Sequence, residues 1–175
     1  MVRIILNNVI AWDSAVSRRI FRLTGRRLLD HVMYWSSRVG DGYIYAVIIL
    51  FMFFIDIHLA PRIVIAGAIA FALELSVQVL VKNKFKRNRP FEKIGEIRSL
   101  INPPDKFSFP SGHTAAAFLM AWLLGHFFPI VTIPAFLFAT AIGFSRIYNG
   151  LHFPSDVIAG MFLGIVCAQI GILCV

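Results

Sequence analysis

Five long, charge-poor apolar runs constrain the fold of this chain more than any other feature of its sequence. The runs are Tyr43–Leu59, Pro61–Val81, Gly112–Phe128, Pro129–Phe144 and Ser155–Val175. A helix needs about 20 residues to cross the hydrocarbon core of a bilayer, and each run approaches that length. With 58% hydrophobic and 15% charged residues, the chain is also too apolar for an ordinary soluble domain. We therefore expect an all-α, polytopic membrane helical bundle of five to six spans, folded as a single domain.

Residues 1–42 have a different pattern from the apolar runs. Apolar residues recur there at three- or four-residue spacing, at Val9, Trp12, Val16, Ile20 and Leu23. Arginines occupy much of the remainder, at Arg18, Arg19, Arg22, Arg26 and Arg27. This pattern is typical of a basic amphipathic helix that lies in the headgroup layer; a spanning helix with a polar middle is the alternative. Gly40-Asp41-Gly42 then breaks the chain before the bundle of residues 43–175.

The distribution of basic residues bears on partners and on orientation. The net charge of +8 indicates anionic lipid headgroups as partners and not nucleic acid, because the chain is a membrane protein. If Tyr43 begins the first span, one face carries 16 of the 17 Lys and Arg, and only Arg62 lies on the other. The positive-inside rule would make the basic face cytoplasmic. An anion site and an interfacial helix would also select basic residues, so the orientation stays open.

Two loops on the basic face, 82–111 and 145–155, are expected to carry a functional site. The first opens with the pattern K-x6-R-P, from Lys82 to Pro90, and the second contributes Arg146. Arginine offers a planar fork to phosphate oxygens and lysine a movable point charge, so Lys82, Arg89 and Arg146 suit an anion. A belt of basic side chains at headgroup level is the alternative. That alternative fits three neighbours, Lys84, Lys86 and Arg87.

The second pattern is Pro110-Ser111-Gly112-His113, directly before an apolar run. Gly112 permits close approach of the backbone, and the N-terminus of the following helix presents unpaired N–H groups to an anion. Ser111 can add its hydroxyl. An ordinary helix start with Ser111 as the cap is the alternative.

The third pattern, S-R-x5-H-x3-D, runs from Ser145 to Asp156 and precedes or opens a helix that we expect to begin near Pro154. A carboxylate at that helix start can turn back and hold one imidazole nitrogen of His152. The other nitrogen then keeps an outward lone pair, as in a catalytic dyad. Lone histidines near a span are more often hydrogen-bonded surface residues, which is our interpretation of His31, His58 and His126.

In this order, the three patterns resemble the signature of the type 2 phosphatidic acid phosphatase family, whose soluble relatives include vanadium haloperoxidases and bacterial acid phosphatases. The resemblance covers residues 82–156 and implies a metal-independent reaction, without a cofactor, through a phosphohistidine. It implies that His152 is the nucleophile, that Asp156 orients it, and that His113 is the general acid. It also implies a set of groups that hold the phosphoryl oxygens: Lys82, Arg89, Ser111, Gly112 and Arg146.

The resemblance also bears on topology. Family members commonly have six spans, whereas here the basic interfacial segment stands in place of the first. Bacterial relatives place the site outside the cytoplasm, which would put it on the periplasmic or external side of the inner (cytoplasmic) membrane. The resemblance and the charge count therefore favour opposite orientations. We favour the periplasmic or external placement, because the basic residues have a second explanation, and the orientation stays open.

One polar stripe lies inside the second apolar run and outside the three patterns. Glu74, Gln78 and Lys82 follow one another at four-residue spacing, which places them on one face of a helix that leads to the site. An ionisable residue in a span is a functional candidate, and we assign Glu74 a supporting role behind the phosphate-binding residues. A hydrogen bond between helices is the alternative.

We therefore expect an integral-membrane lipid phosphatase that acts on a phosphomonoester or diphosphate. The candidate substrates are undecaprenyl diphosphate, phosphatidylglycerol phosphate, phosphatidic acid and lipid A phosphate. A lipid phosphotransferase with the same site and a non-catalytic protein that binds anionic lipid are alternatives. A transporter built around Glu74 is disfavoured, because no half of the chain is repeated. Paired histidines predict a bell-shaped pH dependence of the rate. The oligomeric state stays open.

Overall fold

The computed structural model describes residues 2–103 and 105–175. Pro104, inside the predicted 82–111 loop, lies outside the described residues. Regular structure in these two ranges is helical throughout, in the order α1 (Val2–Phe21), α2 (Arg27–Val39), α3 (Tyr43–Ile55), α4 (Ala60–Phe85), α5 (Pro90–Lys93), α6 (Gly112–Phe127), η1 (Pro129–Val131), α7 (Thr132–Tyr148) and α8 (Pro154–Leu173). The expected all-α membrane bundle is confirmed.

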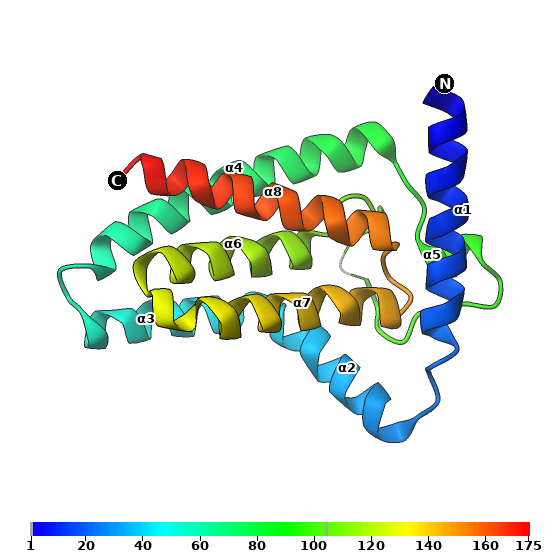
Figure 1. Cartoon of the computed structure of the whole chain (residues 1–175), viewed down its shortest axis with the longest axis horizontal. Helices are drawn as coiled ribbons and strands as arrows, with labels where there is room; N and C mark the ends of the chain where they lie inside the picture. Colours follow the sequence, from blue (N-terminus) through cyan, green and yellow to red (C-terminus); the bar gives the residue numbers. More distant parts are fainter. Residues whose placement is uncertain (1, 104) are drawn as a thin grey trace.

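The bundle is built around α6, which packs against α4, α7 and α8 (Figure 1). Its main core joins side chains of α6 to small residues of α4 and α8: Ala66, Ala70, Leu119, Met120, Leu123, Cys167 and Ala168. Small residues let helix backbones approach closely in a membrane, where the apolar surface of a helix gains little by leaving lipid. The core therefore depends on close packing of α6 against α4 and α8.

Two glycines of α8 fix its distance from α6. A Cβ added to Gly160 would lie 2.4 Å from the carbonyl oxygen of Ser111, and one added to Gly164 would lie 2.1 Å from that of Ala115. Any larger residue would push the two backbones apart. The same close approach lets the Ser111 N–H donate to the carbonyl oxygen of Asp156 (3.0 Å), so the packing of α8 brings two predicted site segments together.

The helices coincide with the five expected apolar runs, although two are shorter than expected. Three helical segments are long and apolar enough to cross a membrane: Ala60–Lys93, Pro129–Tyr148 and Pro154–Leu173. Helix α3 ends at Ile55, because the Asp56 carboxylate accepts hydrogen bonds from the N–H groups of His58 (2.9 Å) and Leu59 (3.0 Å) and turns the chain. Helix α6 has 16 residues, so it is also short for a span.

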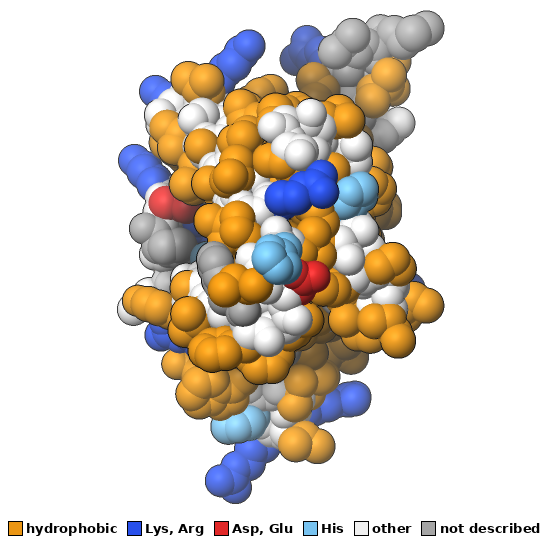
Figure 2. Space-filling model, turned by 90° about the vertical axis from the view of Figure 1, so that its left-hand side faces the viewer, with side chains coloured by type: hydrophobic (Ala, Val, Ile, Leu, Met, Phe, Trp, Pro, Cys, Tyr) orange, Lys and Arg blue, Asp and Glu red, His pale blue; other side chains and the backbone are white. Residues whose placement is uncertain are grey.

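The outer surface of the bundle is apolar. Exposed large hydrophobic side chains occur on α3, α4, α7 and α8, including Phe54, Leu80, Leu137, Phe162 and Leu173. Figure 2, which views the end of the bundle away from α1, shows a surface covered mostly by hydrophobic side chains with a few charged groups between them. This surface fits a lipid environment.

The N-terminal segment forms two helices where the sequence suggested one. Gly25 has φ +91 and separates α1 from α2, and the Asp30 carboxylate accepts a hydrogen bond from the Gly25 N–H (3.1 Å). Helix α1 lies across the end of the bundle where α7 ends and α8 begins (Figure 1). Helix α2 packs against α7, so both helices cover the end of the bundle that holds the predicted site.

Candidate active site

The predicted site residues meet at one end of the bundle. The end of α4, the start of α6, the end of α7 and the start of α8 converge there, around a cavity of about 600 Å³. Six predicted residues line the cavity: Glu74, Lys82, Gly112, His113, Arg146 and His152. The other three, Arg89, Ser111 and Asp156, are buried in the protein beside it.

His152 lies in the short connection between α7 and α8 and is only 2% exposed. Its Nδ1 donates a hydrogen bond to the carbonyl oxygen of Ser108 (2.7 Å), and its Nε2 lies 3.3 Å from Nη1 of Arg89. This arrangement assigns the proton to Nδ1 and leaves the Nε2 lone pair facing a cation. Burial, together with the nearby cations, holds the pKa of His152 well below its usual value of 6.5. The imidazole is therefore neutral and able to act as a nucleophile.

Asp156 supports the His152 segment in a different way from the one expected. Its Oδ2 lies 3.8 Å from Nδ1 of His152, which is beyond hydrogen-bond distance. The Nδ1–H of His152 donates its hydrogen bond to the Ser108 carbonyl oxygen instead. Oδ2 of Asp156 accepts the backbone N–H of Phe153 (2.8 Å). Asp156 therefore fixes the backbone directly after His152 and leaves the imidazole itself to Ser108.

Lys82 and Arg89 converge on a carboxylate that sequence reasoning missed. Lys82 Nζ lies 2.7 Å from Oδ2 of Asp105, and Arg89 Nη2 donates to Oδ1 of the same residue (2.9 Å). Arg89 is held further by hydrogen bonds to the carbonyl oxygens of Leu151 and Phe107. One carboxylate thus bridges the two cations that were predicted to bind phosphate. Asp105 lies in a segment without periodicity, so no pattern pointed to it.

Arg146, at the end of α7, has free donor capacity next to the cavity. Its Nη1 donates to Ser37 Oγ (2.5 Å), while Nε and Nη2 are buried without a hydrogen-bond partner among the described residues. A buried N–H group without a hydrogen-bond partner lowers the stability of the fold. The N–H groups of a guanidinium form strong hydrogen bonds with the oxygens of an anion. The position of Arg146 thus fits phosphate binding better than it fits a belt of basic side chains at headgroup level.

The Pro110–His113 segment is built as a helix start against α4 and α8. Helix α6 begins at Gly112, and a Cβ added there would lie 2.2 Å from the side-chain amide of Gln78, so a larger residue would displace that amide. Ser111 Oγ pairs with Oγ1 of Thr114 (2.9 Å), and Ser111 does not line the cavity. Gly112 therefore lines the cavity, whereas the Ser111 hydroxyl does not.

His113 has a carboxylate partner that comes from the N-terminal part of the chain. Its Nε2 lies 2.8 Å from Oδ1 of Asp41, and Oδ2 of Asp41 accepts a hydrogen bond from Arg38 (3.3 Å). The sequence pattern gave the Gly40-Asp41-Gly42 turn only the role of a break. In the structure the turn borders the cavity and pairs with the histidine that was predicted to be the general acid.

Glu74 is connected to the site through its neighbours on α4. The orientation of the Gln78 side-chain amide is assigned from its hydrogen-bond partners. The amide nitrogen donates to Oε1 of Glu74 (3.1 Å), and the amide oxygen accepts from Nζ of Lys82 (3.0 Å). The predicted stripe is therefore continuous. Glu74 is 1% exposed and lies next to the cavity, in accord with a supporting position.

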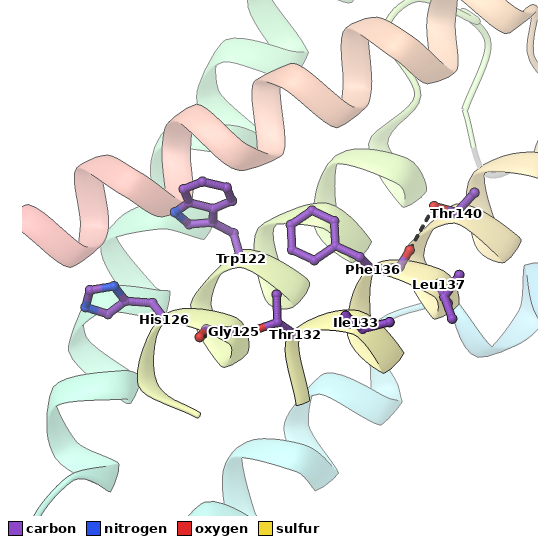
Figure 3. A pocket seen from close by; sticks show the side chains of 8 residues that line it. All are labelled: Trp122, Gly125, His126, Thr132, Ile133, Phe136, Leu137 and Thr140. Atoms are coloured by element: carbon purple, nitrogen blue, oxygen red, sulfur yellow. Dashed lines mark hydrogen bonds between the residues drawn. The ribbon is translucent and has the colours of Figure 1, made fainter. Parts of the chain in front are cut away.

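A second cavity, of about 540 Å³, lies at the other end of α6 and α7 (Figure 3). Its lining is largely apolar, and the rings of Trp122 and Phe136 meet edge to face there, with centroids 6.2 Å apart. His126 is its one titratable side chain. It lies 13 residues after His113 on the same helix, which is about 20 Å along the axis. The residues described around this cavity include no lysine or arginine to bind a phosphate.

Known proteins of similar sequence match part of this chain. Decaprenylphosphoryl-5-phosphoribose phosphatase of Mycobacterium tuberculosis is 38% identical over 104 residues, which cover 57% of this chain and 54% of that protein. Undecaprenyl-diphosphatase of Sulfolobus acidocaldarius is 29% identical over 148 residues, 78% of this chain and 66% of that protein. The matches therefore span about half to two thirds of the length of these relatives.

The fold has solved counterparts. The crystal structure of Aquifex aeolicus LpxE matches 91% of this chain and 93% of its own, with a TM-score of 0.75 and 30% identity. A transmembrane PAP2 type phosphatidylglycerolphosphate phosphatase from Bacillus subtilis shares the fold, with a TM-score of 0.74 over 94% of this chain and 85% of its own, at 24% identity. The family model described as PAP2 superfamily matches residues 62–175. That range contains every predicted site residue from Glu74 to Asp156, and the chain belongs to the PAP2 superfamily.

Proposed function

We propose that this protein is an integral-membrane lipid phosphatase that hydrolyses a phosphomonoester or diphosphate through a phosphohistidine. The observation that carries the proposal is the buried His152, whose Nε2 lies 3.3 Å from Nη1 of Arg89 and which lines one cavity with Arg146. A nucleophile next to convergent cations is the arrangement that phosphoryl transfer needs, because that reaction depends mainly on positioning and on neutralising charge on the phosphoryl oxygens.

The reaction would proceed in two displacements. Nε2 of His152 attacks phosphorus in line, the bond to the leaving oxygen breaks, and His113 gives that oxygen a proton. Lys82, Arg89 and Arg146 neutralise the phosphoryl oxygens as the charge moves. Water then attacks the phosphohistidine, His113 takes a proton from this water, and inorganic phosphate leaves as His152 regains its lone pair.

The lining of the cavity supports an amphiphilic substrate. Part of its lining consists of aromatic and aliphatic residues of α3 and α4, namely Tyr43, Tyr45, Phe71 and Leu75. Tyr43 and Leu75 are 85% and 55% exposed, so this part of the lining reaches the outer surface of the bundle. We place the acyl or prenyl chain here and the phosphate among the cations. The candidate lipids are undecaprenyl diphosphate, phosphatidylglycerol phosphate, phosphatidic acid and lipid A phosphate.

The test is phosphate release by the detergent-purified protein from these four lipids in the presence of EDTA. His152→Ala should lose several orders of magnitude in turnover, and His126→Ala, a matched histidine change on the lining of the second cavity, should keep wild-type turnover. Equal turnover by wild type and His152→Ala would exclude the phosphohistidine. Transfer of the phosphoryl group to an added acceptor lipid without release of inorganic phosphate would identify a phosphotransferase, and binding without either reaction would identify a lipid-binding protein.

We further propose that the site faces the periplasmic or external side of a bacterial inner membrane. A single cysteine placed at the exposed Glu96, in a variant without Cys167 and Cys174, should react with a membrane-impermeant maleimide in intact spheroplasts. Labelling only after lysis would place the site in the cytoplasm, as the charge count suggests.

A further inference from the structure

Helix α1 contacts the bundle through polar residues and exposes apolar ones. Asp13 and Ser17, one turn apart, are 0% and 1% exposed, whereas Ile5 and Trp12 are 57% and 46% exposed. This is the reverse of an amphipathic helix that packs on a water-soluble core. Helix α1 crosses the end of the bundle (Figure 1). Exposed apolar residues on a helix in this position suit the bilayer interface. The buried polar residues therefore need an explanation on the bundle side.

The buried carboxylate of Asp13 lies at the first turn of α8. Its Oδ1 accepts a hydrogen bond from the backbone N–H of Ser155 (2.9 Å), and its Oδ2 accepts one from the Ser155 hydroxyl (2.5 Å). The residue at the N-cap position, Phe153, has no polar side chain, so the first free N–H of the helix would otherwise lack a partner. Asp13 thus supplies, from a distant part of the chain, the carboxylate that caps α8.

Arg87 connects this cap to the catalytic segment. Its Nη2 pairs with Oδ2 of Asp13 (2.5 Å), its Nη1 pairs with Oδ1 of Asp156 (2.5 Å), and the guanidinium lies over the Phe153 ring (4.2 Å to the centroid). Both carboxylates are fully buried. One guanidinium therefore holds two buried carboxylates, and its position depends on both.

The contacts continue to the nucleophile. Asp156 accepts the N–H of Phe153 (2.8 Å), the residue that follows His152. The direction of the His152 imidazole depends on the backbone at this point. A change at Asp13 would release Arg87 on one side, and Asp156 would then be free to shift with the arginine.

We propose that Asp13 is a positioning residue for phosphoryl transfer, so that the bilayer-facing helix α1 is a structural part of the active site. The proposal rests on the proposed function only for its kinetic readout. Asp13 touches no substrate in this scheme; it acts through Arg87 and Asp156 on the placement of His152. Neither the family patterns nor the matched residues 62–175 include it.

The kinetic test compares Asp13→Asn with Glu96→Gln in detergent micelles. Asparagine keeps the size of the side chain and removes the charge that pairs with Arg87. Glu96 makes another polar contact between α1 and the rest of the chain, an exposed ion pair with Arg18 (2.9 Å), and it does not touch Arg87. A small misplacement of a reacting group costs up to about 100-fold in rate. We therefore expect kcat of Asp13→Asn to fall about 10- to 100-fold with KM unchanged, and Glu96→Gln to stay within about 2-fold of wild type.

A double-mutant cycle and amide exchange separate positioning from general destabilisation. If Asp13 acts through Arg87, the Asp13→Asn/Arg87→Gln variant should lose no more kcat than Arg87→Gln alone. Hydrogen exchange should rise selectively at residues 153–157 in Asp13→Asn, with the rest of α8 unchanged. An Asp13→Asn enzyme with wild-type kcat, or with faster exchange across the whole chain and none specific to 153–157, would overturn the proposal.

The exchange measurement also separates the two proposals. If the wild-type protein releases no phosphate from any lipid, the proposed function fails and exchange alone decides the role of Asp13. Selective exchange at 153–157 would then still support positioning of the His152 segment, and unchanged exchange there would overturn it.

Discussion

At the scale of single residues, Asp105 is the group most open to test, because its carboxylate sits between Lys82 and Arg89 where phosphoryl oxygens are expected. A bound phosphate and this carboxylate compete for the same donors. We predict that Asp105→Asn lowers the inhibition constant of orthovanadate by about 5- to 20-fold, since a charged acceptor is removed from two cations. Lys106→Gln, a one-unit change of charge on the neighbouring residue, is the control. Weaker vanadate inhibition in Asp105→Asn would mean that the carboxylate organises the cations and does not compete.

The second prediction at this scale concerns the pair of His113 and Asp41. Burial and the charge of Arg146 lower the pKa of His113, and the Asp41 carboxylate 2.8 Å from the imidazole opposes them, so Asp41 supports the protonated form that a general acid needs. Asp41→Asn should therefore lower kcat about 10- to 100-fold for a lipid phosphomonoester, whose alkoxide leaves poorly without a proton. With p-nitrophenyl phosphate, whose leaving group needs little protonation, the loss should be less than about 3-fold. An equal loss with both substrates would contradict this role.

The pH dependence follows from His152. The fold holds its pKa well below 6.5, so lowering the pH through 6.5 does not protonate it in the folded protein. We predict that kcat/KM retains its value as the pH falls through 6.5 and declines only in more acidic solution, where His152 gains a proton. The unfolded chain binds this proton more readily, so the same group makes the fold less stable below about pH 6.5. An acid limb at or above pH 6.5 in the wild-type profile of kcat/KM would contradict the prediction.

At the scale of secondary-structure elements, the contact between α8 and α6 tolerates no added side-chain atom at Gly160 or Gly164. Gly164→Ala places a Cβ 2.1 Å from a backbone oxygen, which no rotamer change can relieve. We predict a loss of stability of about 1–3 kcal/mol and a loss of activity, because α8 carries Asp156. Gly67→Ala is the matched control on α4, where the added Cβ would meet a Leu123 methyl at an ordinary 3.7 Å. Thermal unfolding of both variants in the same detergent would show the difference; equal midpoints would mean that α8 can move without cost.

The elements also show what sequence patterns can and cannot predict here. The starts of α6 and α8 were predicted within a residue or two, because a glycine or proline turn precedes each apolar run. The cations and histidines of these elements were found because motif spacing places them at helix ends. The break at Gly25 was missed, because an arginine-rich segment looks equally helical on both sides of a glycine. Arg87 was assigned to a surface belt, because one basic residue among several gives no sign of its partner.

At the scale of the whole molecule, three of the missed site residues have a common cause. Asp13, Ser37 and Asp41 reach the site from the N-terminal helices, and Asp13 lies 142 residues before its partner Ser155. Periodicity and motif spacing report on neighbours along the chain, so contacts over such separations are invisible to them. Within residues 82–156 the patterned residues of the site are therefore predictable and Asp105, which lies outside any pattern, is not; the contributions of α1, α2 and the α2–α3 turn are not predictable from such patterns either.

The same separation of Asp13 from Ser155 sets an order of events during biosynthesis. Asp13 is synthesised 142 residues before Ser155, so α1 is made long before the helix that it caps. Until α8 is in place, Asp13 lacks Ser155 and Arg87 lacks Asp156. The contacts that we propose to position His152 can therefore form only after α8 has joined the bundle, and a chain arrested before α8 would hold Asp13 and Arg87 without these partners.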